Sequence, residues 1–196
     1  MLLLSAGTKL LASEANATDR PSADSAGSSL ESLPCAPAVE TLARELAAHA
    51  ISVHRASGTP IVLADALVEA AGVQADLGDA SAAAGLLAEV LDLTRSGEFR
   101  LVAVEAVEGM AWVSAATGDA SGAARMLGAA KAMRQETEGG MPPSRRMRLE
   151  ATEAAVRNAL GADPFAAATA AGRALGREAA TAEALELARG LAAGAA

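Results

Sequence analysis

Residues 101–135, LVAVEAVEGMAWVSAATGDASGAARMLGAAKAMRQ, decide the fold class of this chain. Apolar residues recur at helical spacing on both sides of the turn Thr117-Gly118-Asp119-Ala120. A glycine can end one helix in the left-handed conformation, and an aspartate can cap the start of the next. The stretch therefore predicts two helices, over about residues 101–117 and 120–136, that fold back on each other as a hairpin.

The same pattern occurs forty residues earlier, where Gly78-Asp79-Ala80-Ser81 corresponds to Gly118-Asp119-Ala120-Ser121. A fixed period of this length is typical of helical repeat proteins. It predicts a hairpin of residues 60–77 and 80–95, with Pro60 at the first helical position. A preceding helix, from about residue 38 to Ser57, corresponds to the second half of an earlier unit.

Three more helices are predicted after the Pro142-Pro143 loop, over about residues 144–160, 164–174 and 178–191. We expect Asp163 and Pro164 to cap and open the second of them. The last helix carries charged residues that suit an outward face closing the end of a stack: Glu178, Glu183, Glu186 and Arg189. The predicted fold is an all-α, right-handed solenoid of antiparallel hairpins with about seven or eight helices.

The apolar composition is dominated by alanine, since 52% of the 196 residues are hydrophobic but only 2% are aromatic. Stability must therefore come from many small contacts between closely spaced helices. Residues 13–37 are rich in Ser, Ala, Asp, Gly and Pro, and we expect a disordered tail over residues 1–37, followed by a helical repeat domain over residues 38–192. The single cysteine, Cys35, falls in this tail and excludes an intrachain disulfide.

The net charge of −8 argues against a protein that wraps nucleic acid or lies on an anionic membrane. No apolar run is long enough to span a bilayer, and the first residues lack the positive start and unbroken apolar core of a secretory signal. We therefore expect a cytoplasmic protein with a basic or amphipathic partner. Self-association is left open.

Residues that carry catalysis or bind metal are sparse. His49 and His54 are five positions apart, which turns them about 140° from each other on a helix and prevents them from holding one metal ion. Carboxylate pairs occur one helical turn apart, but nothing in the sequence desolvates them: Asp65 with Glu69, and Glu105 with Glu108. We expect no catalytic residue, no metal and no cofactor.

Two Gly-Asp turns between amphipathic helices, with small residues such as Ala71, Ala83, Ala111 and Ala123 at the helix contacts, resemble a tetratricopeptide repeat. Residues 109–175 in particular are similar to the helical C-terminal arrays of bacterial signal-transduction ATPases, namely the AfsR/SARP-like and LuxR-type transcriptional regulators. The forty-residue period exceeds the usual thirty-four, and the chain holds no GxxxxGK[ST] nucleotide-binding motif. The resemblance implies an interaction or regulatory scaffold without enzymatic activity.

In that family the first helix of each hairpin lines the concave surface. The resemblance therefore implies a partner-binding groove formed by Asp65, Val68, Gly72 and Asp76 from one unit and by Glu105, Glu108 and Trp112 from the next. We expect this acidic strip to attract a basic or amphipathic peptide, with Trp112 as its anchor. The alternative is that Trp112 fills a gap in the core and that the carboxylates are simply solvated.

The basic cluster Arg145, Arg146 and Arg148 is expected to pair with Glu136, Glu138 or the next repeat rather than with nucleic-acid phosphate. Two other functions remain as alternatives. A DNA-contacting regulator would need a basic face, and a ligand carrier or enzyme would need an enclosed apolar pocket lined by Trp112, Met110 and Met126.

Overall fold

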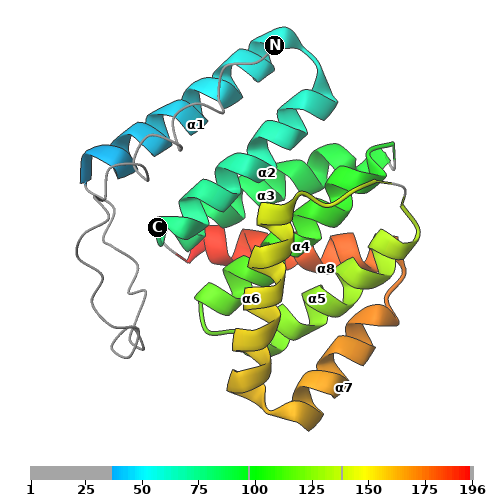
Figure 1. Cartoon of the computed structure of the whole chain (residues 1–196). Helices are drawn as coiled ribbons and strands as arrows, with labels where there is room; N and C mark the ends of the chain where they lie inside the picture. Colours follow the sequence, from blue (N-terminus) through cyan, green and yellow to red (C-terminus); the bar gives the residue numbers. More distant parts are fainter. Residues whose placement is uncertain (1–36, 97, 138, 195–196) are drawn as a thin grey trace, which may run out of the picture. The chain divides into compact units, whose positions relative to one another are not determined.

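The computed structural model describes residues 37–96, 98–137 and 139–194, and these contain helices but no strand. The expected all-α class is therefore confirmed for this part of the chain (Figure 1). Eight α-helices and a short 3₁₀ helix, η1 (Thr94–Ser96), are described. The α-helices are α1 (Pro37–Ser57), α2 (Pro60–Asp76), α3 (Ala80–Leu93), α4 (Arg100–Ala116), α5 (Ala120–Gln135), α6 (Pro143–Leu160), α7 (Ala162–Arg173) and α8 (Arg177–Ala193). The predicted tail, residues 1–37, and Cys35 lie outside the described residues except for Pro37.

Two hairpins, α2–α3 and α4–α5, are closed by the same turn. Gly78 and Gly118 have φ angles of 78° and 85°, a conformation that glycine adopts without steric cost. The next residue caps the following helix: Asp79 accepts the backbone N–H of Ala82 at 3.0 Å, and Asp119 accepts that of Gly122 at 2.8 Å. The hydrogen bond from Ala82 lowers the pKa of Asp79 below its usual value, and the nearby Arg44 adds to the effect.

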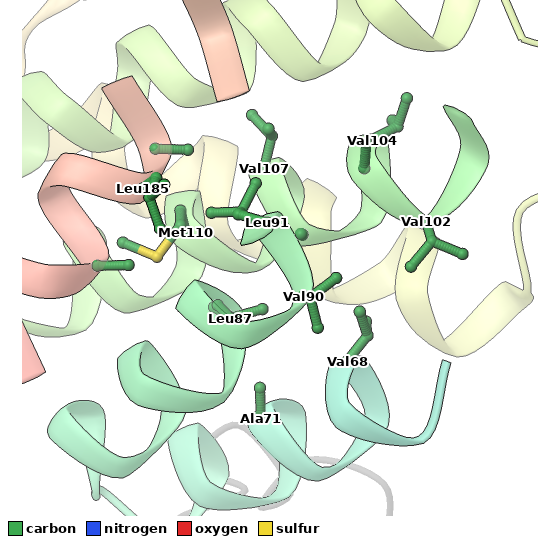
Figure 2. Packing of buried hydrophobic residues seen from close by; sticks show 14 of the residues in the cluster. Val68, Ala71, Leu87, Val90, Leu91, Val102, Val104, Val107, Met110 and Leu185 are labelled. Atoms are coloured by element: carbon green, nitrogen blue, oxygen red, sulfur yellow. The ribbon is translucent and has the colours of Figure 1, made fainter. Parts of the chain in front are cut away.

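The main core lies between α2, α3, α4, α5 and α8, and Figure 2 shows part of it. Helix α4 is its centre, because Val102 through Ser114 are all buried. Alanines occupy many of the helix contacts, and the larger fully buried side chains are Leu, Val and Met residues such as Leu67, Leu87, Leu91 and Met110. A helix buried all round must have neighbours on every side, and α4 contacts α2, α3, α5, α6 and α8.

Helix α8 does not close the end of a one-way stack as expected. It returns to the first complete hairpin and packs along α3, with further contacts to α4 and α5. Two of the charged residues assigned to an outward face instead make ion pairs with neighbouring helices: Glu183 with Arg125 of α5, and Arg189 with Asp92 of α3. The physical reason is the stripe of small and apolar residues between these two charges, Ala180, Ala184, Leu185 and Ala188, which is buried in the core.

The start of α7 also differs from the prediction. The helix begins at Ala162, and its N-cap is Gly161, so Asp163 and Pro164 lie within the first turn. Gly161 has a φ angle of 82° and serves as the C-cap of α6 as well, which leaves no separate capping position for Asp163. Both residues suit a first turn, since a carboxylate favours the positive helix end and proline needs no N–H there.

Helices α5 and α7 pack closely through two glycines. A Cβ atom at Gly128 of α5 would clash with the backbone carbonyl of Thr169, and one at Gly172 of α7 would clash with that of Arg125. These two glycines set the distance between the helices, because a backbone cannot move aside as a flexible side chain can.

Helix α1 packs on α2 with one buried side chain, that of Ile51. Its other large apolar residues are about half exposed, namely Val39, Leu42, Leu46 and Val53, with values of 52%, 53%, 60% and 49%. Their spacing of three, four and seven residues places them on one side of the helix. We call this set the α1 stripe.

Candidate binding face

The predicted groove residues lie on the neighbouring helices α2 and α4, but they do not form an open acidic strip. Asp65 and Asp76 are exposed. The residues expected to hold the partner are buried instead: counted over the whole residue, Val68 is 1% exposed, Glu105 6%, Glu108 2% and Trp112 9%. Gly72 is buried as well. The solvated alternative is therefore wrong for Glu105 and Glu108, and each of them has an arginine partner.

Arg145, at the start of α6, reaches across the face formed by α2 and α4. Its Nη2 donates to Oε1 of Glu69 at 2.5 Å, and its Nη1 makes an ionic contact of 2.6 Å with Oε1 of Glu105. The Arg145 side chain is only 7% exposed and that of Glu105 only 8%. Burial alone would lower the pKa of Arg145, but the carboxylates of Glu105 and Glu69 raise it above its usual value. The arginine is therefore held in the charged state between the two hairpins.

Arg148 lies one helical turn after Arg145 and covers the aromatic residue. Its Cζ is 4.9 Å from the centroid of the Trp112 ring, within the range of a cation–π interaction. Its Nη2 donates to Oδ2 of Asp76 at 2.5 Å. A Cβ atom at Gly72 would lie 2.8 Å from Nη1 of Arg148, so the absence of a side chain at Gly72 makes room for the guanidinium group. We call the surface formed by Glu69, Gly72, Asp76, Glu105 and Trp112 the arginine seat.

Glu108 lies one helical turn after Glu105 on α4 and belongs to a separate ion pair. Arg134 of α5 binds it through two hydrogen bonds, with Nε to Oε1 at 2.6 Å and Nη2 to Oε2 at 2.8 Å. Desolvation raises the pKa of Glu108 above its usual value, and the opposing effect of Arg134 does not fully offset it. Glu108 therefore ties α4 to α5 and is shielded from a partner.

The pairing expected for the basic cluster is corrected by the structure. Arg145 and Arg148 pair with carboxylates of the two earlier hairpins, whereas Glu136 pairs with Arg177 of α8. Glu138 lies outside the described residues. Sequence reasoning assigned neither Glu69 nor the arginines to the groove. The signal that could have found them is the spacing of Arg145 and Arg148, which puts two cations on one helix face of an acidic chain.

The other expected sites are placed as follows. His49 is exposed and His54 partly buried, and no group of three or more His, Cys, Asp or Glu residues within the described ranges is close enough to hold a metal ion. Met110 and Met126 are fully buried, and the cavity that Trp112 lines is about 110 Å³. That volume is below the range of most small-molecule sites. Over the same ranges, no helix has the length and apolarity needed to cross a membrane.

Comparison of the chain with models of known protein families, with curated proteins and with solved structures found no match.

Proposed function

We propose that this chain is a non-catalytic interaction module, built as a tetratricopeptide-like helical array, that binds an arginine-bearing helix of a protein partner. The observation that carries the proposal is the arginine seat, in which Arg145 lies between Glu69 and Glu105 while Arg148 lies over Trp112. The sequence predicts that a basic or amphipathic peptide binds this face, and α6 of the same chain occupies it.

The chemistry of the seat specifies what it can accept. Two guanidinium groups three residues apart on a helix face match three carboxylates and one aromatic ring. Lysine is a poorer fit, because its compact ammonium group neither bridges two carboxylates as a planar fork does nor stacks as well. The preferred partner is therefore a helix with an Arg-x-x-Arg pattern.

The attachment of α6 to the arginine seat is weak enough for a partner helix to replace it. Of its side chains, only Arg145 and Val156 are buried, and the exposed Met147 contributes little to packing. The first turns of α6 are thus held mainly by ion pairs, which weaken when salt is added. When α6 leaves the seat, Glu105 becomes accessible to water, so the carboxylate is not left buried without a partner. A partner helix with the same pattern can then compete for the seat.

The test uses a labelled peptide of residues 142–160 and the full chain carrying Arg145→Ala and Arg148→Ala, whose seat is vacated. We expect saturable binding by fluorescence anisotropy and a change in emission of Trp112, the only tryptophan. A peptide with both arginines replaced by alanine should bind at least about tenfold more weakly, since charge-assisted hydrogen bonds are lost.

The matched control is a peptide with Arg146→Ala, because Arg146 is exposed and makes no ion pair within the described part of the chain. It should bind as the unchanged peptide does. On the receiving side, Gly72→Leu should block binding by filling the space that Arg148 occupies. Equal binding by all three peptides, or no binding by any of them, would overturn the proposal.

The two alternative functions have less support. A DNA-contacting regulator needs free cations, but Arg145 and Arg148 are engaged with carboxylates. An enzyme or carrier with a pocket at Trp112 would have to work within about 110 Å³. The resemblance to regulator arrays is consistent with a scaffold or sensor role, for which binding of a partner helix suffices.

We infer a second contact through the α1 stripe, with another copy of this chain as its occupant. Helix α1 has Glu40 in its first turn and His54 in its last, so two antiparallel α1 helices place a carboxylate near an imidazole at each end. Sedimentation velocity should show a concentration-dependent dimer that Leu42→Glu with Leu46→Glu abolishes. Met147→Glu, at the exposed apolar residue of α6, is the control. A wild-type chain that stays monomeric at all concentrations would rule this contact out.

A further inference from the structure

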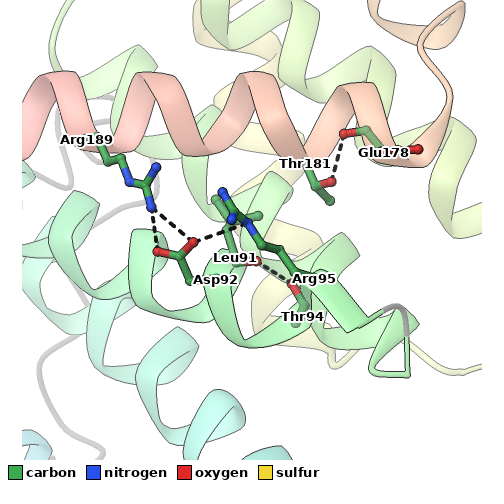
Figure 3. A network of polar contacts seen from close by, with 7 residues as sticks. All are labelled: Leu91, Asp92, Thr94, Arg95, Glu178, Thr181 and Arg189. Atoms are coloured by element: carbon green, nitrogen blue, oxygen red, sulfur yellow. Dashed lines mark hydrogen bonds and ion pairs between the residues drawn. The ribbon is translucent and has the colours of Figure 1, made fainter.

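A cavity of about 610 Å³ lies away from the arginine seat, where the end of α3 and η1 meet the first turns of α4 and α8. Figure 3 shows two of its walls, with Thr94 and Arg95 on one side and Glu178 and Thr181 of α8 on the other. Small-molecule sites have volumes of roughly 300–1,000 Å³. The cavity is thus large enough for a ligand.

The charge of the lining is opposite to that of the whole chain. Three arginines, Arg95, Arg100 and Arg177, line the cavity together with one acidic residue, Glu178. The chain as a whole has a net charge of −8. A cationic lining in an acidic protein favours an anionic ligand, because the arginines supply a local attraction that the rest of the surface lacks.

These arginines have unused donors. Arg100 makes no hydrogen bond or ion pair with any described residue, and Arg95 has only an exposed contact of 3.3 Å with Asp92. Arg177 donates from Nη2 to Glu136 at 3.0 Å, but its Nε is buried and has no hydrogen-bond partner among the residues that the structure describes. A buried donor without a partner is costly, and an acidic head group in the cavity would relieve that cost.

The backbone adds to this preference. Helices α4 and α8 both begin at the cavity, and neither N-cap residue, Phe99 or Gly176, provides a side-chain capping hydrogen bond. The first N–H groups of a helix lack partners within the helix and carry a partial positive charge. The two uncapped helix starts therefore add to the positive potential that the arginines create in the cavity.

The apolar part of the lining comes from Leu91, Phe99, Ala103, Ala182 and Leu185, and Thr94 and Thr181 complete it. We propose that this cavity binds a small amphipathic anion, whose carboxylate or phosphate pairs with Arg100 and Arg177 and whose apolar body lies against Phe99 and Leu185. The site is independent of the arginine seat. Because it joins α3, α4 and α8, the bound ligand stabilises the packing of α8 on the first hairpin.

The test is isothermal titration calorimetry of the full chain with octanoate, octyl phosphate and octanol. Saturable binding of either anion is expected, and the stronger of the two identifies the head group. Octanol, which has the same apolar body and no charge, should bind at least about tenfold more weakly. Equal binding of octanol, or binding of neither anion, would overturn the proposal.

Substitutions of residues inside and outside the cavity test whether the anion binds there. Arg100→Gln and Arg177→Gln should each weaken anion binding by about tenfold. Arg173→Gln, at an exposed arginine of α7 outside the cavity, should leave it unchanged. Ala182→Phe should block binding by filling the cavity from an exposed position of α8, with the helical circular dichroism retained. Anion binding unaffected by Arg100→Gln and Ala182→Phe would place the ligand elsewhere and refute the assignment.

Discussion

Replacing Arg145 with alanine should lower the free energy of unfolding more than any other single change of a charged residue in α6. The guanidinium group is the link between α6 and the two earlier hairpins, through Glu69 and Glu105. Its loss removes one contact that is mostly in water and one that is almost fully buried. The two contacts therefore contribute very differently.

The magnitude follows from the exposure of each partner. The Glu69 side chain is 75% exposed, and an ion pair of that kind contributes at most about 1 kcal/mol. The Glu105 side chain is 8% exposed, and removing the partner of a buried charge costs about 3–5 kcal/mol. Because the start of α6 can move outward and admit water to Glu105, we expect the lower end of that range, about 3 kcal/mol in total.

The assay is equilibrium unfolding in urea, followed by circular dichroism and by Trp112 fluorescence. Arg55→Ala is the matched control, since it breaks an exposed pair with Glu89, with side chains 53% and 35% exposed, and should cost less than about 1 kcal/mol. Glu105→Gln in the Arg145→Ala background should recover stability, giving a coupling of about 2 kcal/mol between the two positions. Equal costs for Arg145→Ala and Arg55→Ala, or strict additivity with Glu105→Gln, would refute the reasoning.

Three further predictions concern packing, capping and pH. Gly172→Ala should lower the free energy of unfolding by about 2 kcal/mol or more, because the new Cβ would meet the α5 backbone. Gly176→Ala is the control and should change it little, because a Cβ at Gly176 would have open space. Thermal melts of the two variants make the comparison. Asp119→Ala should cost about 1 kcal/mol through loss of the N-cap bond to Gly122, and Asp119→Asn should restore most of it in the same melts. The raised pKa of Glu108 means that the folded chain holds this proton more tightly than the unfolded chain. The contribution of Glu108 to stability should thus be highest in acid and should fall as the pH rises from about 4.5 through the folded-state pKa. Urea titrations at several pH values measure this slope of the unfolding free energy against pH, and Glu108→Gln should remove it. The same slope in both proteins would contradict the assignment.

The local features of this fold could be predicted because they depend on neighbouring residues. Gly118 ends α4 and Asp119 caps α5 through atoms no more than a few positions away. The apolar periodicity of residues 101–135 likewise predicts two helices whatever the rest of the chain does. The start of α7 differs from the predicted one, because Gly161 is at once the C-cap of α6 and the N-cap of α7, so Asp163 is not the cap.

The sequence by itself determined the all-α class, the hairpin turns and which carboxylates share the faces of α2 and α4. Only the tertiary structure decided that α8 returns to α3 and that α6 covers those carboxylates, since Arg145 meets Glu69 across 76 residues of chain. The physical reason is that helical periodicity fixes which side chains lie together on one helix. The exposure of a charge depends on which distant segment can neutralise it, and in this protein that segment supplies Arg145 and Arg148.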